Sequence, residues 1–190
     1  MSWEALAVST GVVAVGEIGD KTQLLALLLA ARFRRPWPII VGIFVATLAN
    51  HALASALGAW LQSLVSHEVL RWALGASFLA VAAWALVPDR LEDEQVPRPS
   101  ALGVFGVTVV AFFFAEMGDK TQIATVMLAA QYASLVAVTA GTTLGMMLAN
   151  VPAVLLGERA VRFVPLVWVR RVAAGMFALL GILVLAGVAF

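Results

Sequence analysis

The chain has 190 residues, of which 63% are hydrophobic and 12% are charged, and its net charge is +1. Soluble domains carry about 25% charged residues, so this composition predicts an integral membrane protein. Cysteine is absent, which excludes disulfides, thiol catalysis and thiolate metal sites. The sequence has no basic patch with interleaved aromatic residues, so a nucleic-acid partner is not expected.

Six apolar segments are long enough to cross a bilayer, which takes about 20 residues. Charge clusters and prolines separate these segments, and the six tryptophans fall at or near their ends, as interfacial anchors do. No basic stretch precedes the first segment, so no cleavable signal peptide is expected. The predicted spans are Ala5–Ala31, Pro38–Leu61, Val69–Val87, Ala101–Ala130, Leu135–Leu156 and Val167–Ala189.

The arginines are distributed unevenly between the two sides of the predicted membrane. Nine lie at the connections between spans 1 and 2, 3 and 4, and 5 and 6, whereas Arg71 alone lies on the opposite side. The positive-inside rule therefore places the arginine-rich side in the cytoplasm and both termini outside. The nine residues are Arg32, Arg34, Arg35, Arg90, Arg98, Arg159, Arg162, Arg170 and Arg171.

A seven-residue motif occurs twice and differs at one position. Residues Glu17–Gln23 read EIGDKTQ, and residues Glu116–Gln122 read EMGDKTQ. Further along the chain, Leu48–Asn50 matches Leu148–Asn150, with one inserted residue between the motif and this second match. The chain is therefore expected to consist of two repeated halves.

The repeat predicts the organisation of the whole chain. Residues 1–87 form the first half, residues 88–100 a charged, proline-containing cytoplasmic linker, and residues 101–190 the second half. Each half contains three spans, an odd number, so the second half is inverted relative to the first. We predict an all-α integral membrane fold of six transmembrane helices in a 3+3 inverted-topology repeat, a common design of secondary transporters.

Each copy of the repeated motif places two carboxylates and a lysine near the middle of a span. An ionisable group there costs roughly 2.5–3.5 kcal/mol if it is left without a partner. On a continuous helix Glu17 and Asp20 would share a face, with Lys21 on the adjoining strip. Gly19 and Gly118 would let the helices approach closely or let the backbone open locally.

Inversion would bring the two copies together, which predicts one site with four carboxylates. If all are ionised, four carboxylates and two lysines carry a charge of −2, which a divalent cation would neutralise. Oxygen ligands without cysteine favour Ca²⁺, Mg²⁺ or Mn²⁺ over copper or zinc. The alternative is that the charges form buried ion pairs that only hold spans 1 and 4 together. The carboxylates are those of Glu17, Asp20, Glu116 and Asp119.

Other polar residues of the spans are weaker candidates. Asn50 and Asn150 occupy corresponding places and would either offer oxygens to a cation or hydrogen-bond neighbouring helices. His51 has no counterpart, because Val151 takes its place, so we expect a packed or pore-wall histidine, with proton sensing as the alternative. The full set of predicted metal ligands is Glu17, Asp20, Glu116, Asp119, Asn50, Asn150, Gln23 and Gln122, supported by the motif residues Gly19, Lys21, Thr22, Gly118, Lys120 and Thr121.

The double Glu-x-Gly-Asp-Lys-Thr motif in a six-span chain closely resembles the Gdt/MneA family of small cation/proton antiporters. The resemblance covers essentially the whole chain. It implies that the four carboxylates bind the cation, that Mn²⁺ or Ca²⁺ is exchanged for protons, and that no prosthetic group is needed. The short linker and the lack of a long N-terminal extension fit a protein of the bacterial inner membrane.

We therefore expect a secondary transporter, not an enzyme, which exports a divalent cation while protons compete for the same carboxylates. A passive cation channel would show flux without proton coupling. An exporter of small organic molecules would leave the repeated motif unexplained. An intramembrane aspartyl protease would use Asp20 and Asp119, but a lysine follows each of them and glutamates accompany both. Both a monomer and a homodimer are compatible with two halves in one chain.

Overall fold

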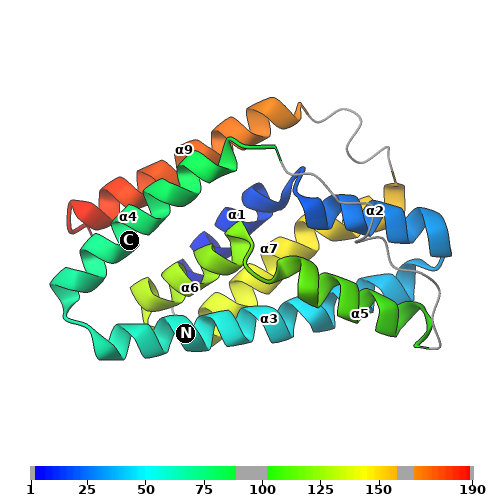
Figure 1. Cartoon of the computed structure of the whole chain (residues 1–190), viewed down its shortest axis with the longest axis horizontal. Coiled ribbons are helices and arrows are strands. Elements are labelled where there is room, and N and C mark those ends of the chain that lie inside the picture. Colours follow the sequence, from blue (N-terminus) through cyan, green and yellow to red (C-terminus); the bar gives the residue numbers. More distant parts are fainter. Residues whose placement is uncertain (1–2, 89–101, 158–164, 189–190) are drawn as a thin grey trace.

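The computed structural model describes residues 3–88, 102–157 and 165–188, and all regular structure in these ranges is helical (Figure 1). The predicted linker at residues 88–100 lies, except for Pro88, outside the described residues. The all-α prediction is confirmed. The helices are α1 (Trp3–Glu17), α2 (Lys21–Phe33), α3 (Pro36–Leu64), α4 (His67–Ala85), α5 (Gly103–Glu116), α6 (Lys120–Tyr132), α7 (Leu135–Leu156) and α9 (Leu166–Leu185).

Four of these helices, α3, α4, α7 and α9, are long and apolar enough to cross a membrane. They correspond to the second, third, fifth and sixth predicted spans, and α7 has the predicted bounds. Large apolar side chains are exposed along them, for example Leu53, Leu148 and Ile182, as contact with lipid requires. The chain is therefore a membrane protein that crosses the bilayer several times.

The first and fourth predicted spans are not continuous helices. Both are interrupted at the repeated motif, between α1 and α2 and between α5 and α6. Gly19 and Gly118 adopt φ angles of +81° and +75°, a region that residues with a side chain rarely occupy. The prediction that Glu17 and Asp20 share a face of one helix was wrong. The sequence allowed two roles for the glycines, close helix packing or local opening of the backbone, and the structure shows the second.

The two interrupted helices cross the molecule in opposite directions, and their breaks lie side by side near its middle (Figure 1). Helix α1 packs against α7, and its counterpart α5 packs against α3. Helices α2 and α6 likewise pack against α7 and α3, while α3 and α7 contact each other. The helices of one half are thus packed largely on helices of the other.

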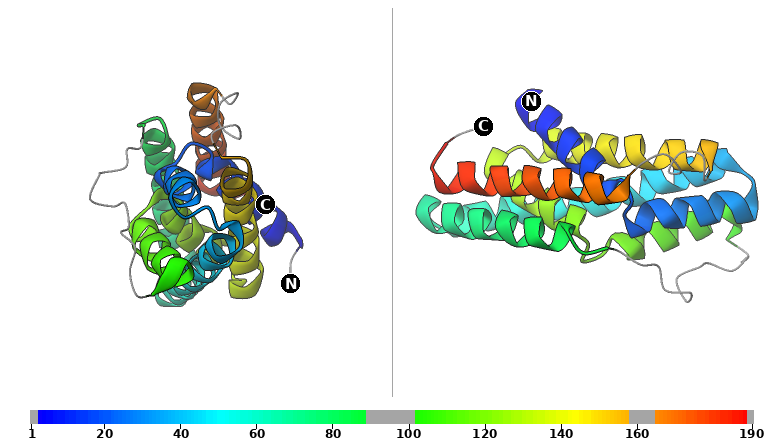
Figure 2. Two further views of the ribbon diagram at one scale, coloured as in Figure 1. Left: turned by 90° about the vertical axis from the view of Figure 1, so that its right-hand side faces the viewer. Right: turned by 90° about the horizontal axis from the view of Figure 1, so that it is seen from above.

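Helices α4 and α9 pack against each other along one flank of the bundle (Figures 1 and 2). The start of α1 and the end of α9 lie at the same end of the molecule, and the connection between α2 and α3 lies at the other. This arrangement puts the connection that contains Arg34 and Arg35 at the end of the molecule away from the start of α1 and the end of α9.

The apolar core consists of two separate clusters. One is formed mainly by side chains of α1, α4, α6 and α9 and includes Phe78 and Phe177. The other is formed by α2, α3, α5 and α7 and includes Ile43 and Phe112. Because α1 and α6 belong to the first cluster and α2 and α5 to the second, the repeated motif lies where one apolar core ends and the other begins.

Candidate metal site

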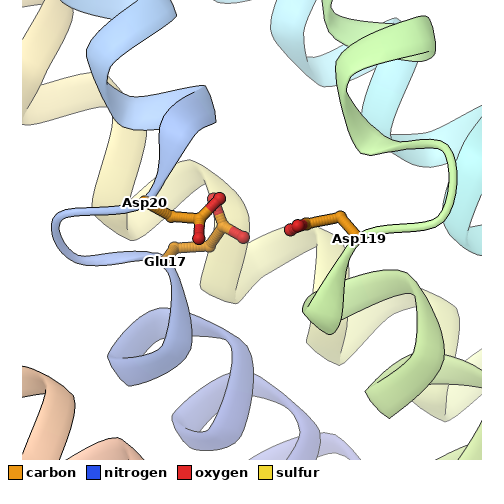
Figure 3. Close-up of side chains that lie close together, drawn as sticks. All are labelled: Glu17, Asp20 and Asp119. Carbon is orange, nitrogen blue, oxygen red and sulfur yellow. The ribbon is translucent and has the colours of Figure 1, made fainter. Parts of the chain in front are cut away.

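Three carboxylates from the two breaks meet in the interior. Glu17, Asp20 and Asp119 each offer one oxygen, and these three oxygens lie within 4.8 Å of one another. All three side chains are buried, and they point toward one another across the gap between the breaks (Figure 3). We refer to these three residues as the acidic cluster. Its members come from both halves of the chain.

Glu116 is the fourth predicted carboxylate, and it lies beside the acidic cluster without being a member of it. Its side chain is completely buried, and the three cluster residues are near enough for their charges to act on it. Its Oε2 atom accepts a hydrogen bond from Thr121 Oγ1 at 3.2 Å. The structure thus brings three of the predicted carboxylates into close contact and holds the fourth at the edge.

Each lysine of the repeated motif pairs with the aspartate of the other copy. Lys21 Nζ lies 3.3 Å from Asp119 Oδ1, and Lys120 Nζ lies 3.0 Å from Asp20 Oδ1. The two pairs differ in burial, since the side chain of Lys21 is 22% exposed and that of Lys120 only 7%. These crossed ion pairs tie the two breaks together and neutralise both aspartates.

The threonines and glutamines of the repeated motif make equivalent contacts in the two halves. Thr22 Oγ1 donates to Glu17 Oε2 at 2.5 Å, as Thr121 does to Glu116. Gln23 Oε1 accepts from the Gly19 N–H at 2.8 Å, and Gln122 Oε1 accepts from the Gly118 N–H at 2.7 Å. The threonines therefore orient the glutamates, and the glutamines close the two turns.

The amide nitrogens of the same glutamines reach into the other half. Gln23 Nε2 donates to the Ala149 carbonyl at 2.9 Å, and Gln122 Nε2 donates to Asn50 Oδ1 at 2.9 Å. Both glutamines were predicted as metal ligands, and so was Asn50. In this structure the side-chain oxygens of all three already accept hydrogen bonds, so their role as ligands stays a prediction.

Asn150 differs from Asn50 in this respect. Its Nδ2 donates to the Met146 carbonyl at 3.1 Å, while its Oδ1 is buried without a hydrogen-bond donor in the described part of the chain. It also faces Glu17. The Oε1 atoms of Glu17 and Glu116 likewise lack a donor among the described residues. Buried oxygens without donors are rare, and these three belong to residues at or beside the breaks.

The aspartates occupy the N-cap positions of α2 and α6 without capping them. Asp20 and Asp119 have the extended backbone typical of an N-cap, with φ/ψ of −78°/167° and −82°/164°, but neither side chain makes the capping hydrogen bond to a backbone N–H of its helix. Asp119 Oδ2 accepts a hydrogen bond from Thr121 Oγ1 at 3.3 Å. Both side chains turn into the acidic cluster instead. The N-termini of α2 and α6 and the C-termini of α1 and α5 all end there, as in discontinuous transporter helices that bind ions.

His51 is a further buried polar residue near the breaks. It lies on α3 with no exposed surface, and its Nε2 atom is 4.0 Å from Glu116 Oε2. A narrow cavity reaches Asp20 and Lys120 from the first turns of α9, where Arg170 lines it. Glu116 with its neighbour His51, and this cavity, are thus both found next to residues of the two breaks.

The arrangement is suited to holding a hard cation. Its oxygens are carboxylate and amide oxygens, several of them without donors, and cysteine is absent. Sequence reasoning missed the crossed ion pairs and the turn-closing glutamines. The near-identity of the two copies of the motif was a signal for these contacts. Two segments with the same sequence that pack against each other symmetrically make the same contacts twice.

Comparison with known proteins gives one consistent result. The family model described as "Divalent cation/proton antiporter GDT1" matches residues 5–93 and 104–189. A protein of Vibrio cholerae named "Putative manganese exporter" is 53% identical over 178 residues, which cover 93% of this chain and 88% of that protein. A GDT1-like protein of Synechocystis is 33% identical over 77% of this chain and 79% of its own.

More distant relatives come from plants. A protein of rice (Oryza sativa subsp. indica) named "GDT1-like protein 4" is 27% identical over 168 residues, covering 75% of this chain and 59% of the rice protein. No solved structure matches the chain significantly.

Proposed function

Because the chain belongs to the GDT1 family of divalent cation/proton antiporters, we propose that it binds Mn²⁺ at the acidic cluster and exports it from the cytoplasm in exchange for protons. The family is one of transporters, and its substrates are a divalent cation and protons. The choice of Mn²⁺ follows the name of the Vibrio cholerae relative, and Ca²⁺ is the second candidate.

The observation that carries the proposal is the meeting of Glu17, Asp20 and Asp119 between two apolar cores. Together with Glu116 and the two lysines, the groups around the breaks carry a charge of −2 when all are ionised. A divalent cation would neutralise this charge. The buried oxygens of Glu17, Glu116 and Asn150 that have no donor among the described residues would then find a partner in the ion.

Proton coupling follows from the chemistry of the ligands. A carboxylate binds a metal ion only when it is deprotonated, so metal and protons compete for the same oxygens. Protons entering from the side of higher proton concentration would expel the metal toward that side. In a bacterium the inward proton gradient would drive Mn²⁺ out of the cell.

We propose that the breaks in α1–α2 and α5–α6 divide two transmembrane spans, which gives six spans in a 3+3 inverted repeat. The opposite directions of the two interrupted helices and the equivalent packing of α1 on α7 and α5 on α3 support this. Transport would follow from one half rocking against the other around the acidic cluster. The cavity beside Asp20 would be the path to the side of Arg170.

The location we propose is a bacterial inner membrane, with both termini outside the cytoplasm. This orientation follows from the sequence, because the positive-inside rule would assign the arginines between α2 and α3 and near the start of α9 to the cytoplasm. The described structure offers no support for the aspartyl protease considered above, because each aspartate is paired with a lysine and a protease dyad shares a proton instead.

The proposal is tested in proteoliposomes that contain the purified protein and a pH-sensitive dye. Addition of Mn²⁺ on one side should move protons in the opposite direction, and Asp20→Asn should abolish both fluxes. Mn²⁺ uptake without proton movement would point to a passive channel and would contradict the antiport. Parallel measurements with Ca²⁺ and Mg²⁺ give the order of preference.

A further inference from the structure

His51 is placed beside the proposed ion path but has no role in the repeated motif. It follows Asn50 on α3 and is fully buried, close to Glu116. The corresponding position on α7 is Val151, so the second half has no such group. An imidazole on one side of an otherwise repeated arrangement breaks its symmetry.

The imidazole lacks the partners that a buried histidine normally has. Neither Nδ1 nor Nε2 makes a hydrogen bond in the part of the chain that the structure describes. A buried polar group without a partner costs about 1–3 kcal/mol, so such groups are uncommon unless something else satisfies them. The Oε1 atom of Glu116 is likewise buried without a hydrogen-bond partner among the described residues. A single ligand bound between these two neighbouring buried groups would satisfy both of them.

The distance between these groups indicates what kind of partner they fit. Nε2 of His51 lies 4.0 Å from Oε2 of Glu116, too far for a hydrogen bond. Two ligands of one metal ion at bond lengths of about 2.0–2.3 Å can be separated by up to about 4.6 Å. The separation therefore fits two ligand atoms on opposite sides of one cation.

We propose that His51 and Glu116 are a further pair of ligands for the transported ion and that His51 makes the site prefer first-row transition ions over Ca²⁺ and Mg²⁺. This inference rests on the proposed function, because the pair would hold the transported ion at a second position, next to the acidic cluster of Glu17, Asp20 and Asp119. Ca²⁺ and Mg²⁺ take oxygen ligands almost exclusively, whereas transition ions accept imidazole nitrogen. A single nitrogen beside the carboxylates would therefore discriminate between Mn²⁺ and Ca²⁺.

The direct test is pulsed electron paramagnetic resonance of Mn²⁺ bound to the purified full-length protein. A directly coordinated imidazole gives a ¹⁴N coupling, which should be present in the wild type and absent in His51→Val. The His51→Val substitution gives position 51 the side chain that its counterpart Val151 already has. Mn²⁺ bound without a ¹⁴N coupling in the wild type would overturn the proposal.

Binding measurements give a second test that a loss of stability alone would not imitate. In His51→Val the affinity for Mn²⁺ should fall on the order of tenfold or more, while that for Ca²⁺ changes less than about twofold. Val151→Ala is the matched control and should leave both affinities unchanged. His51→Gln keeps a polar side chain and should also lose the preference for Mn²⁺; an equal fall for both ions in His51→Val and His51→Gln would contradict the proposal.

Failure of the proposed role of His51 can be told apart from failure of the proposed antiport. Proton-coupled Mn²⁺ exchange without a ¹⁴N coupling would refute the role of His51 and leave the antiport standing. A ¹⁴N coupling in a protein that moves no protons would support the role of His51 and refute the antiport.

Discussion

Lys120 Nζ lies 3.0 Å from Asp20 Oδ1, so a lysine of the second half neutralises a buried aspartate of the first. The reciprocal pair, Lys21 with Asp119, is longer at 3.3 Å and more exposed. The two pairs are equivalent in sequence but differ in their surroundings. This difference makes the energetic role of each pair measurable by substitution.

Lys120→Met should destabilise the protein more than Lys21→Met does. Removing Lys120 leaves the charge of Asp20 buried beside Glu17, and breaking a buried ion pair costs about 3–5 kcal/mol. Lys21 is partly exposed, and water can replace part of its effect. Thermal unfolding in detergent without metal measures both. Asp20→Asn combined with Lys120→Met should recover most of the loss, and additive effects would show that the two residues do not interact.

The glycines of the two breaks form a natural pair for measuring backbone strain. A side chain at φ near +80° costs about 1–2 kcal/mol, so both Gly19→Ala and Gly118→Ala should lower the stability. The added carbon atom at position 19 would also lie 2.7 Å from Leu166 Cδ2, whereas at position 118 it meets nothing within 4 Å. Gly19→Ala should therefore be the more harmful, as judged by unfolding temperature, and equal effects would contradict the described packing of α9 on the first break.

The four carboxylates should not be equivalent in metal binding. Glu17→Gln, Asp20→Asn and Asp119→Asn each remove a charge from the acidic cluster and should lower the affinity for Mn²⁺ on the order of 100-fold or more. Glu116→Gln should have a smaller effect, about tenfold, because that residue lies at the edge of the cluster. Titration of the purified variants with Mn²⁺ tests the order. A loss of Mn²⁺ affinity in Glu116→Gln as large as that in Asp119→Asn would contradict this order and would indicate that all four carboxylates bind the ion equally.

Trp84 is expected to stabilise Lys120 through its ring. Lys120 Nζ lies 6.0 Å from the centroid of that ring, at the outer limit of a cation–π contact worth about 0.5–1 kcal/mol. Trp84→Leu should lose this contribution and Trp84→Phe should keep part of it. Unfolding measurements in the wild type and in Lys120→Met test the contact, because the difference between Leu and Phe should shrink when the lysine is absent.

The affinity for Mn²⁺ should fall as the pH is lowered. Protons and the metal compete for the same carboxylates, so binding releases protons and is favoured by higher pH. Calorimetric titrations in buffers of different ionisation enthalpy count the protons released per ion. A proton count of zero at every pH would contradict competition at the acidic cluster.

The sequence predicted the helical membrane fold and the meeting of carboxylates from both copies of the motif, but not the breaks in the helices. Hydropathy identifies apolar segments, and Ala5–Ala31 is apolar enough to look like one span. The positive φ of Gly19 and Gly118 is accompanied by a hydrogen bond from each glycine N–H to the glutamine four residues later, and hydropathy does not register such a contact. The family resemblance was confirmed by the comparisons because the motif is specific and present twice.

The contacts made by the motif residues were harder to predict than the breaks, because they join residues that are far apart in sequence. Pairing Lys120 with Asp20 requires two segments that are far apart in sequence to meet in opposite directions. The position of Glu116 beside His51 depends on α3, where the two halves differ. The missing counterpart of His51 was visible in the sequence, but only the structure shows that this histidine lies next to a carboxylate.

The crossed lysine–aspartate pairs have the form of an interface between two identical partners, in which the lysine of each meets the aspartate of the other. A single copy of the motif could make both contacts only by joining a second copy inserted in the membrane the opposite way. A chain that contains both copies makes the two reciprocal contacts without a second molecule. Because both copies belong to one chain, they need not be identical, and His51 stands in one half where the other has Val151.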